Sequence, residues 1–121
     1  MILSGGPSSV NDSRLPAFNK EIFSLELPIL GLCYGHQLIA QHFGGRIENK
    51  GKGEFGKAWL HFKSSEESPL WEGLVPPTQV WMSHGDNVTQ CPPDFQIVGQ
   101  TDHCEIAAMK HVKKSIYSLQ F

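Results

Sequence analysis

This sequence lacks the features that identify several common functional classes. Its 121 residues carry 10 basic and 12 acidic side chains, a net charge of -2, and no stretch interleaves basic with aromatic residues as a nucleic-acid-binding surface does. No apolar run is long enough to span a membrane, and the first residues lack the basic start and small-residue cleavage site of a signal peptide. These absences argue against nucleic-acid and membrane partners, and they predict a soluble, cytoplasmic protein.

Cysteine is also scarce. Cys33, Cys91 and Cys104 are an odd number, and their spacing does not match a metal site. This pattern favours a reducing compartment over a disulfide framework. The length suits one domain with its own hydrophobic core, and the sequence contains no repeat or convincing linker.

The first third of the chain alternates between strand and helix patterns. Apolar segments at residues 1–3 and 28–32 predict buried strands, a glycine and serine loop follows the first of them, and residues 16–25 predict a helix. A second helical pattern begins after residue 33 and ends at Gly44. Such an alternation is typical of a mostly parallel central sheet with flanking helices.

The rest of the chain is rich in short β segments. The predicted strands are residues 46–50, 58–63, 79–84, 95–101, 106–110 and 115–121. The prediction is therefore an α/β fold with a β-rich C-terminal half. Both ends interrupt apolar strands, so we expect the domain to be incomplete at each end.

The stretch "GLCYG" places a cysteine at a strand-to-helix corner. Gly31 and Gly35 lie two residues on either side of Cys33, the spacing of a nucleophile elbow, in which glycines allow a sharp turn and the side chain stands exposed beside a helix N-terminus. The amide dipoles there favour thiolate over thiol. Without the glycines, a small core residue would be the preferred interpretation of Cys33.

A cysteine that attacks a carbonyl group needs donors for the oxyanion. The backbone N–H of Tyr34 follows the nucleophile and is one candidate, and the N–H of Gly6 in the loop "SGGP" is the other. Gln37 lies one helical turn beyond the cysteine, and Ser83 and Asp86 follow an apolar strand where ligands gather. An ordinary turn around "SGGP" or Asp86, and a surface role for Gln37, remain alternatives.

The general base is harder to find. Two of the six histidines, His84 and His103, precede an acidic residue by two positions, but nothing in the sequence brings either of them to Cys33. We therefore expect that the chain does not contain its own base.

Together these motifs resemble a known family. "GLCYGHQ" preceded by "SGGP" is similar to the class I glutamine amidotransferases, cysteine hydrolases that release ammonia from glutamine and have a flavodoxin-like fold. The segments "EFGKA", "LWEGL" and above all "VWMSHGD" resemble the glutaminase domains of bacterial GMP synthases. The resemblance extends over practically the whole chain, which it implies to be a partial amidotransferase domain, residues 1–121.

The resemblance also implies a role for each candidate residue. Cys33 would be the nucleophile, and the N–H groups of Gly6 and Tyr34 would form the oxyanion hole. The residues implied to hold the substrate glutamine are Gln37, Ser83 and Asp86. No metal or cofactor is implied for this domain.

Further parts of such an enzyme are implied to lie outside the chain. In the family a His-Pro-Glu segment supplies the catalytic histidine and glutamate directly after the last strand, and a strand and helix precede the first, so residues 1–121 alone are expected to be inactive. An ATP pyrophosphatase domain uses ATP and Mg²⁺ to aminate XMP to GMP, and a dimerisation domain makes a homodimer.

Three alternatives stay open on the sequence alone. The first is that the chain is the glutaminase of another synthase, such as anthranilate synthase or carbamoyl phosphate synthetase. Those glutaminases usually carry leucine at the position of Tyr34 and lack "WMSHGD". A non-catalytic amidotransferase-like module would keep the fold with a vestigial cysteine. A cysteine peptidase or esterase could use a similar elbow.

Overall fold

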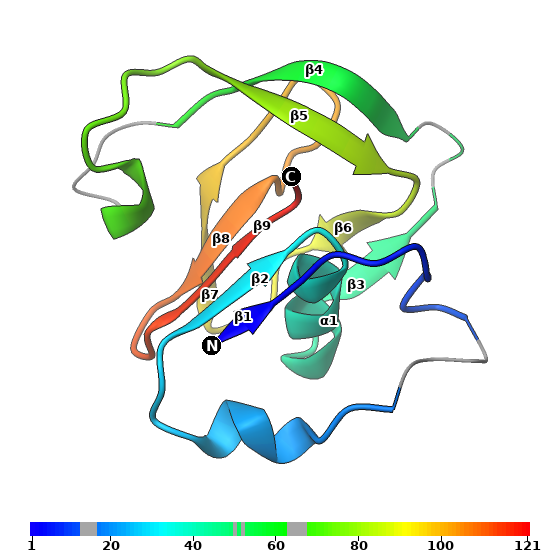
Figure 1. Cartoon of the computed structure of the whole chain (residues 1–121), viewed down its shortest axis with the longest axis vertical. Helices are drawn as coiled ribbons and strands as arrows, with labels where there is room; N and C mark the ends of the chain where they lie inside the picture. Colours follow the sequence, from blue (N-terminus) through cyan, green and yellow to red (C-terminus); the bar gives the residue numbers. More distant parts are fainter. Residues whose placement is uncertain (13–16, 50, 52, 63–67) are drawn as a thin grey trace.

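A mixed five-stranded sheet forms the centre of the molecule (Figure 1). The computed structural model describes residues 1–12, 17–49, 51, 53–62 and 68–121. In spatial order the strands are β1 (Ile2–Leu3), β2 (Ile29–Leu32), β9 (Ile116–Leu119), β8 (Ala108–His111) and β7 (Phe95–Gly99). The pairings of β2 with β1 and with β9 are parallel, whereas β8 pairs antiparallel with both β9 and β7.

The predicted α/β fold is confirmed, with a more even mixture of strand directions than expected. Two of the four pairings in the central sheet are parallel, because the last three strands follow one another through short connections that permit only antiparallel neighbours. In the described part of the chain the sheet is covered by one α-helix, α1 (Tyr34–His42), and none of the described helices is both long and apolar enough to cross a membrane.

The helix predicted at residues 16–25 is shorter than expected. The structure has a 3₁₀-helix, η1 (Lys20–Ser24), and residue 16 lies outside the described residues. The side chain of Asn19 accepts a hydrogen bond from the Glu21 N–H at 2.9 Å, and the backbone is already extended at Leu25. A capping side chain at Asn19 therefore sets the start later than the apolar spacing suggested.

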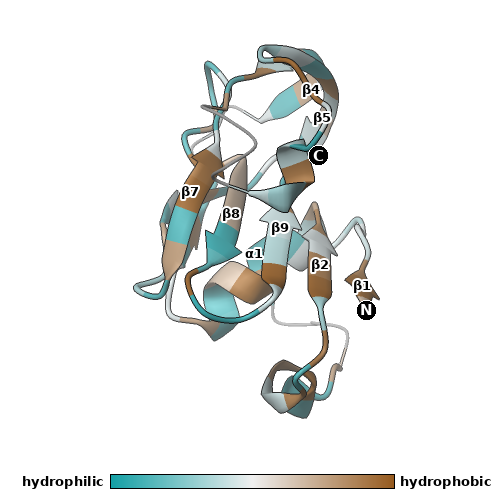
Figure 2. Cartoon of the chain, turned by 90° about the vertical axis from the view of Figure 1, so that its left-hand side faces the viewer, coloured by the Kyte–Doolittle hydropathy of each residue, from teal (hydrophilic) through white to brown (hydrophobic). Residues whose placement is uncertain are grey.

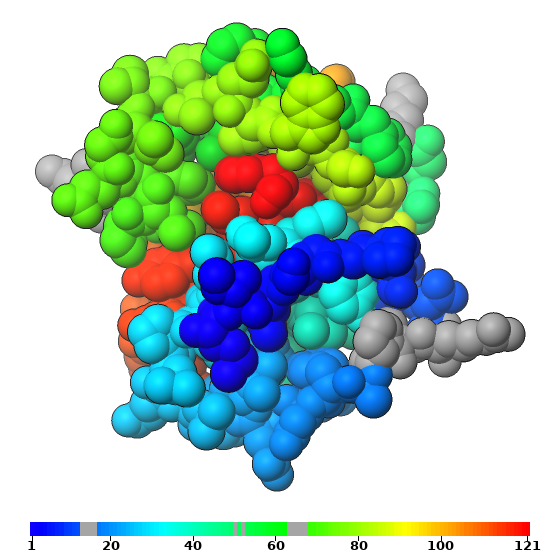
Figure 3. All heavy atoms as spheres, in the orientation of Figure 1, coloured from blue at the N-terminus to red at the C-terminus, as the bar shows by residue number. Residues whose placement is uncertain are grey.

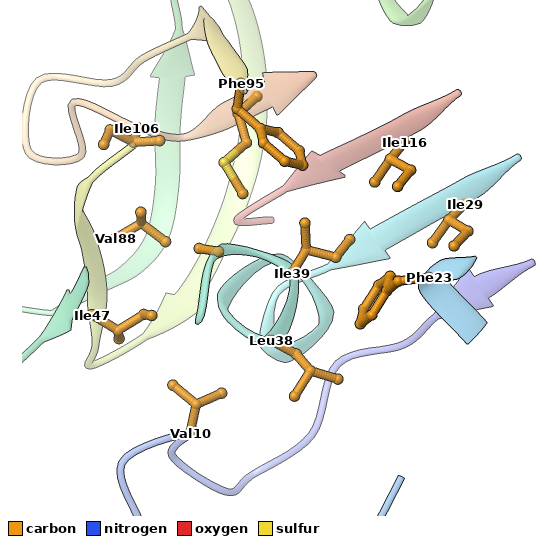
Figure 4. Packing of buried hydrophobic residues seen from close by; sticks show 12 residues of the cluster. Val10, Phe23, Ile29, Leu38, Ile39, Ile47, Val88, Phe95, Ile106 and Ile116 are labelled. Atoms are coloured by element: carbon orange, nitrogen blue, oxygen red, sulfur yellow. The ribbon is translucent and has the colours of Figure 1, made fainter. Parts of the chain in front are cut away.

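Helix α1 and the central sheet enclose the main core. Figure 4 shows Ile39 pointing from α1 toward the side chains of Ile29 and Ile116 on the neighbouring strands, with Phe23 from η1 beside them. Ile39 is completely buried. In Figure 2 hydrophobic residues mark the central strands, and the connecting segments are mostly hydrophilic.

Two antiparallel ribbons complete the fold. One pairs β3 (Arg46–Glu48) with β6 (Asn87–Gln90), and the other pairs β4 (Glu54–Leu60) with β5 (Thr78–His84). The second ribbon arches over one end of the central sheet in Figure 1. A smaller core lies beneath it, where Trp71 of η3 (Pro69–Trp71) stacks on Phe62 with ring centroids 4.8 Å apart.

Close backbone contacts fix the corner between β2 and α1. A Cβ atom on Gly35 would overlap the carbonyl group of Leu3 on β1, and one on Gly31 would lie 2.6 Å from Cδ1 of Ile39 and 2.7 Å from the Gly35 oxygen. Both glycines are therefore required sterically, since side chains of any size would separate α1 from the sheet.

Substitution of Gly35 by alanine tests this packing. We expect Gly35→Ala to lower the free energy of unfolding by roughly 1–3 kcal/mol or more, because the added methyl group meets backbone that cannot move aside. Gly6→Ala is the matched control, because a Cβ at Gly6 meets nothing within 4 Å. Urea unfolding of both variants measures the difference, and equal midpoints would contradict the steric account.

Candidate active site

Cys33 occupies the corner between β2 and α1 in an unusual backbone conformation. Its φ of 51° and ψ of -102° make it the one non-glycine residue with positive φ among the described residues. The Cys33 N–H donates to the Leu119 carbonyl at 2.8 Å, and the Cys33 carbonyl accepts from the Gln37 N–H at 3.2 Å. Such a conformation costs on the order of 1–3 kcal/mol and persists only where its surroundings impose it, as these hydrogen bonds and the flanking glycines do.

The cysteine faces a cleft of about 380 Å³. Every candidate residue from the sequence lines this cleft: Gly6, Cys33, Tyr34, Gln37, Ser83 and Asp86. In Figure 3 the C-terminal residues, drawn in red, lie between the β4–β5 ribbon and the N-terminal segment. The candidate residues come from three segments that are far apart in sequence, around residues 6, 33 and 83, and these segments meet at one cleft.

The thiol of Cys33 has two polar neighbours. Its Sγ lies 3.7 Å from the Ser83 carbonyl oxygen, to which the thiol donates, and 3.8 Å from Nε2 of Gln120, which donates to the sulfur. Burial raises the pKa of the thiol, whereas hydrogen bonds from the Tyr34 backbone and from Gln120 lower it by less. The amide at the elbow thus favours the thiolate, as predicted, but burial outweighs it.

Gln37 and Asp86 are held against each other at the floor of the cleft. Nε2 of Gln37 donates to the backbone carbonyl of Asp86 at 3.1 Å and to Oε1 of Gln120 at 3.3 Å. The hydroxyl of Ser9 donates to the Asp86 carboxylate. With an exposed fraction of 4%, Gln37 is not the surface glutamine that the sequence left as an alternative.

Two polar residues at the site were missed in the sequence. Ser9 lies in a loop with no characteristic spacing. Gln120 lies in the apolar segment 115–121, which was predicted only as a strand. Gln120 is fully buried and its amide links Gln37 to the cysteine sulfur. A buried glutamine within an apolar segment is the signal that could have identified it, because buried amides need partners.

Within the described residues, which include all six histidines, no histidine side chain forms a hydrogen bond with the Cys33 sulfur. His84 lines the same cleft, but its Nδ1 lies 2.9 Å from the backbone oxygen of Asp86 and its Nε2 lies 3.3 Å from Oε2 of Glu54. His103 is likewise not among the partners of the sulfur. The described residues therefore contain no base paired with the cysteine.

His36 follows the elbow but points into the protein interior. It is completely buried, and its Nδ1 lies 2.8 Å from the hydroxyl of Ser118. Burial is the main cause that lowers the pKa of His36 from 6.5 to about 3, and its electrostatic interaction with His84 contributes a smaller part of that shift. His36 is therefore neutral at physiological pH and serves the packing between α1 and β9.

One group of side chains in the described residues has the composition of a metal site. Ligand atoms of Glu54, His84 and Cys104 lie within 4.8 Å of one another, and all three residues are buried. Glu54 and His84 already pair with each other, and burial together with the charge of Glu54 raises the pKa of the Cys104 thiol to about 12. Both carboxyl oxygens of Glu54 and both ring nitrogens of His84 already have hydrogen-bond partners, so the arrangement fits a hydrogen-bonded network better than a ligand set.

Comparison with known proteins agrees with this geometry. The family described as "Glutamine amidotransferase class-I" matches residues 1–121. The chain is 45% identical over 121 residues to the GMP synthase [glutamine-hydrolyzing] of Clostridium novyi and 46% identical to that of Thermus thermophilus. All of this chain is covered in both alignments, but only 23% and 24% of the relatives, so the chain spans about a quarter of their length.

Solved structures show the same fold. A protein from Thermoplasma acidophilum, provisionally assigned as one component of a GMP synthase, matches with a TM-score of 0.78 and 33% identity. The match covers 84% of this chain and 50% of that one. A glutamine amidotransferase from Thermotoga maritima has a TM-score of 0.73 at 24% identity, over 84% and 43% of the two chains.

From the environment of Cys33 we expect its thiol to be alkylated slowly in the 121-residue chain. Its rate of alkylation by iodoacetamide should rise with pH with an apparent pKa above the ordinary value of 9.0, because burial disfavours the thiolate. Gln120→Leu should move the apparent pKa higher still, since it removes a donor to the sulfur. Peptide mass spectrometry resolves Cys33 from the other cysteines, and an apparent pKa below 9.0 would contradict this account.

His36 predicts a loss of stability in acid. Because its pKa is about 3 in the folded state and 6.5 in the unfolded chain, the unfolded state binds the extra proton first. The contribution of neutral His36 to the free energy of unfolding is fully present above pH 6.5. As the pH falls toward 3, the free energy of unfolding decreases by up to about 1.4 kcal/mol per pH unit. His36→Met cannot take up the proton, so its denaturation free energy should decline less steeply over this range. Parallel curves for the two proteins would rule the effect out.

Proposed function

The chain belongs to the class I glutamine amidotransferase family, and we propose that its cleft binds glutamine and that Cys33 attacks the side-chain amide. The observation that carries the proposal is the convergence of the six candidate residues on one cleft around a strained elbow. Neither the cleft nor the elbow would be needed for a buried structural cysteine.

The proposed reaction proceeds through a thioester. Sγ of Cys33 forms a bond to the amide carbon, and the carbonyl oxygen becomes an oxyanion that the N–H groups of Gly6 and Tyr34 stabilise. The tetrahedral intermediate expels ammonia once the leaving nitrogen gains a proton. Water then attacks the thioester, releasing glutamate and restoring the thiol.

The polar residues of the cleft suit the other end of glutamine. The Asp86 carboxylate is the anionic group available to pair with the α-ammonium, and Gln37 holds the loop that carries it through the 3.1 Å hydrogen bond to the Asp86 carbonyl. Ser83 borders the cleft at the end of β5 and offers backbone and hydroxyl groups to the same part of the substrate. These contacts act equally on substrate and transition state, so their loss should raise KM more than it lowers kcat.

The intact protein is proposed to be a GMP synthase. The curated relatives carry that name, and the segment "VWMSHGD" resembles the glutaminase domains of bacterial GMP synthases. In this proposal ammonia from the cleft aminates XMP in an ATP- and Mg²⁺-dependent synthetase domain of the same protein, which also carries the dimerisation domain. A histidine and glutamate from outside these 121 residues complete proton transfer, a contribution typically worth about a hundred- to ten-thousand-fold.

A non-catalytic module is the second candidate. The raised pKa of Cys33 and the lack of a base among the described residues both fit a cysteine that is not used. The two proposals differ in the selectivity expected of Cys33. A catalytic site should react preferentially with electrophilic analogues of glutamine, whereas a vestigial site should not distinguish them from other electrophiles.

Substrate hydrolysis by the full-length protein separates the two candidates. We expect ammonia release from glutamine, a loss of more than about a thousand-fold in kcat for Cys33→Ala, and a rise of about ten-fold or more in KM for Asp86→Asn. Asp94→Asn, an exposed aspartate away from the cleft, is the matched control and should leave both constants unchanged. A chloroketone analogue of glutamine should label Cys33, and labelling at another cysteine or ammonia release by Cys33→Ala would contradict the proposal.

A further inference from the structure

A chain of buried hydrogen bonds leads from the cleft, which His84 lines, to Glu54 and Thr101. It begins where β4 and β5 pair, because Glu54 and His84 are directly opposite each other in that ribbon. Their side chains are 7% and 1% exposed, and Nε2 of His84 lies 3.3 Å from Oε2 of Glu54. A Cβ at Gly53 would collide with the carbonyl of His84, so glycine permits the two strands to approach this closely.

The orientation of the His84 ring is determined by its neighbours. Nδ1 lies 2.9 Å from the backbone carbonyl oxygen of Asp86, which can only accept, so Nδ1 carries a proton. Nε2 lies 3.3 Å from Oε2 of the Glu54 carboxyl group. The imidazole therefore connects Glu54 to the backbone of the Asp86 loop.

Glu54 is held in turn from the opposite side. The hydroxyl of Thr101 donates to Oε1 of Glu54 at 2.8 Å, and the hydroxyl oxygen itself accepts from the Cys104 N–H at 3.1 Å. Because the Thr101 oxygen accepts from a backbone N–H, its own proton is free for the carboxyl group. Each of the two Glu54 carboxyl oxygens thus has a hydrogen-bond partner.

The chain ends at the residue proposed to bind the substrate ammonium. The Asp86 carbonyl accepts from His84 on one side and from Gln37 at 3.1 Å on the other. Two donors on one backbone oxygen fix the peptide plane between Asp86 and the next residue. The carboxylate of Asp86 departs from that fixed backbone, with Ser9 donating to it.

We propose that Glu54, His84 and Thr101 are positioning residues that set the affinity of the cleft for glutamine by holding the Asp86 loop. This rests on the proposed function for the identity of the ligand, while the contacts themselves do not depend on it. None of the three touches the sulfur of Cys33, so they act through Asp86 and not on the attacking atom.

The relevant comparison is between Glu54→Ala and Glu54→Gln in the full-length protein. Alanine leaves the Thr101 hydroxyl and His84 Nε2 without partners, whereas a glutamine amide can accept from Thr101 and donate to neutral His84. We expect Glu54→Ala to raise KM for glutamine by about ten-fold with kcat changed by less than about two-fold. Glu54→Gln should restore KM to within about two-fold of the original value.

Two controls separate positioning from general damage. Val98→Ala removes buried volume from the same core without touching the hydrogen-bonded chain, so its KM should not change. Iodoacetamide, which has no ammonium group, should alkylate Cys33 at equal rates in the original protein and in Glu54→Ala. A chloroketone analogue of glutamine should inactivate Glu54→Ala about ten-fold more slowly at low concentration.

Thr101 supplies a second route to the same test. Thr101→Val keeps the shape but removes the donor to Glu54, and Thr101→Ser keeps the donor. The valine variant should raise KM and the serine variant should not. If Glu54→Ala does not fold, this pair decides the matter.

Hydrogen exchange gives a result that is independent of the ligand. Backbone amides of residues 85–87 should exchange faster in Glu54→Ala than in the original protein, and at the original rate in Glu54→Gln. An unchanged KM together with unchanged exchange would overturn the inference while leaving the proposed function intact. If the original protein releases no ammonia from glutamine, the proposed function fails, and the exchange rates still decide whether Glu54 holds the loop.

Discussion

The site depends on one steric constraint, the close approach of the elbow backbone to β1 and to α1. Gly35 leaves no room for a side chain beside Leu3, and Gly31 leaves none beside Ile39. Only this approach lets Cys33 stand at a positive φ between a strand and a helix. The cost of that conformation, on the order of 1–3 kcal/mol, is offset by core packing around α1, so the stability of the fold and the placement of Cys33 share one cause.

Elements packed on two separate hydrophobic cores line the cleft. The larger core, around Ile39, holds the elbow, and the smaller one, around Trp71, holds the β4–β5 ribbon that carries Ser83. Polar contacts join the two halves, chiefly the amide of Gln37 and the ring of His84 on the same Asp86 oxygen. Because Ser83 of the ribbon also contacts the Cys33 sulfur, movement of the ribbon relative to the sheet would alter the surroundings of both Asp86 and Cys33.

Much of the site was predictable because its signals are local. The glycines around Cys33 indicate the elbow, and a serine and aspartate at a strand end indicate a binding edge. Long-range polar partners were not predictable, since nothing in the sequence shows that Thr101 reaches Glu54 across the fold. The pattern His84-Gly85-Asp86 suggested a base with its carboxylate, whereas the ring binds the Asp86 backbone. Strand β6 was missed because its residues are mostly polar.

We propose that the elbow presents a tetrahedral adduct on Cys33 to two backbone N–H groups. A crystal structure of the full-length protein with the aldehyde analogue of glutamine bound as a hemithioacetal would locate the adduct oxygen. We expect this oxygen about 2.7–3.1 Å from the backbone nitrogens of Gly6 and Tyr34. An adduct oxygen directed to solvent, with Cys33 in an ordinary negative-φ conformation, would contradict it.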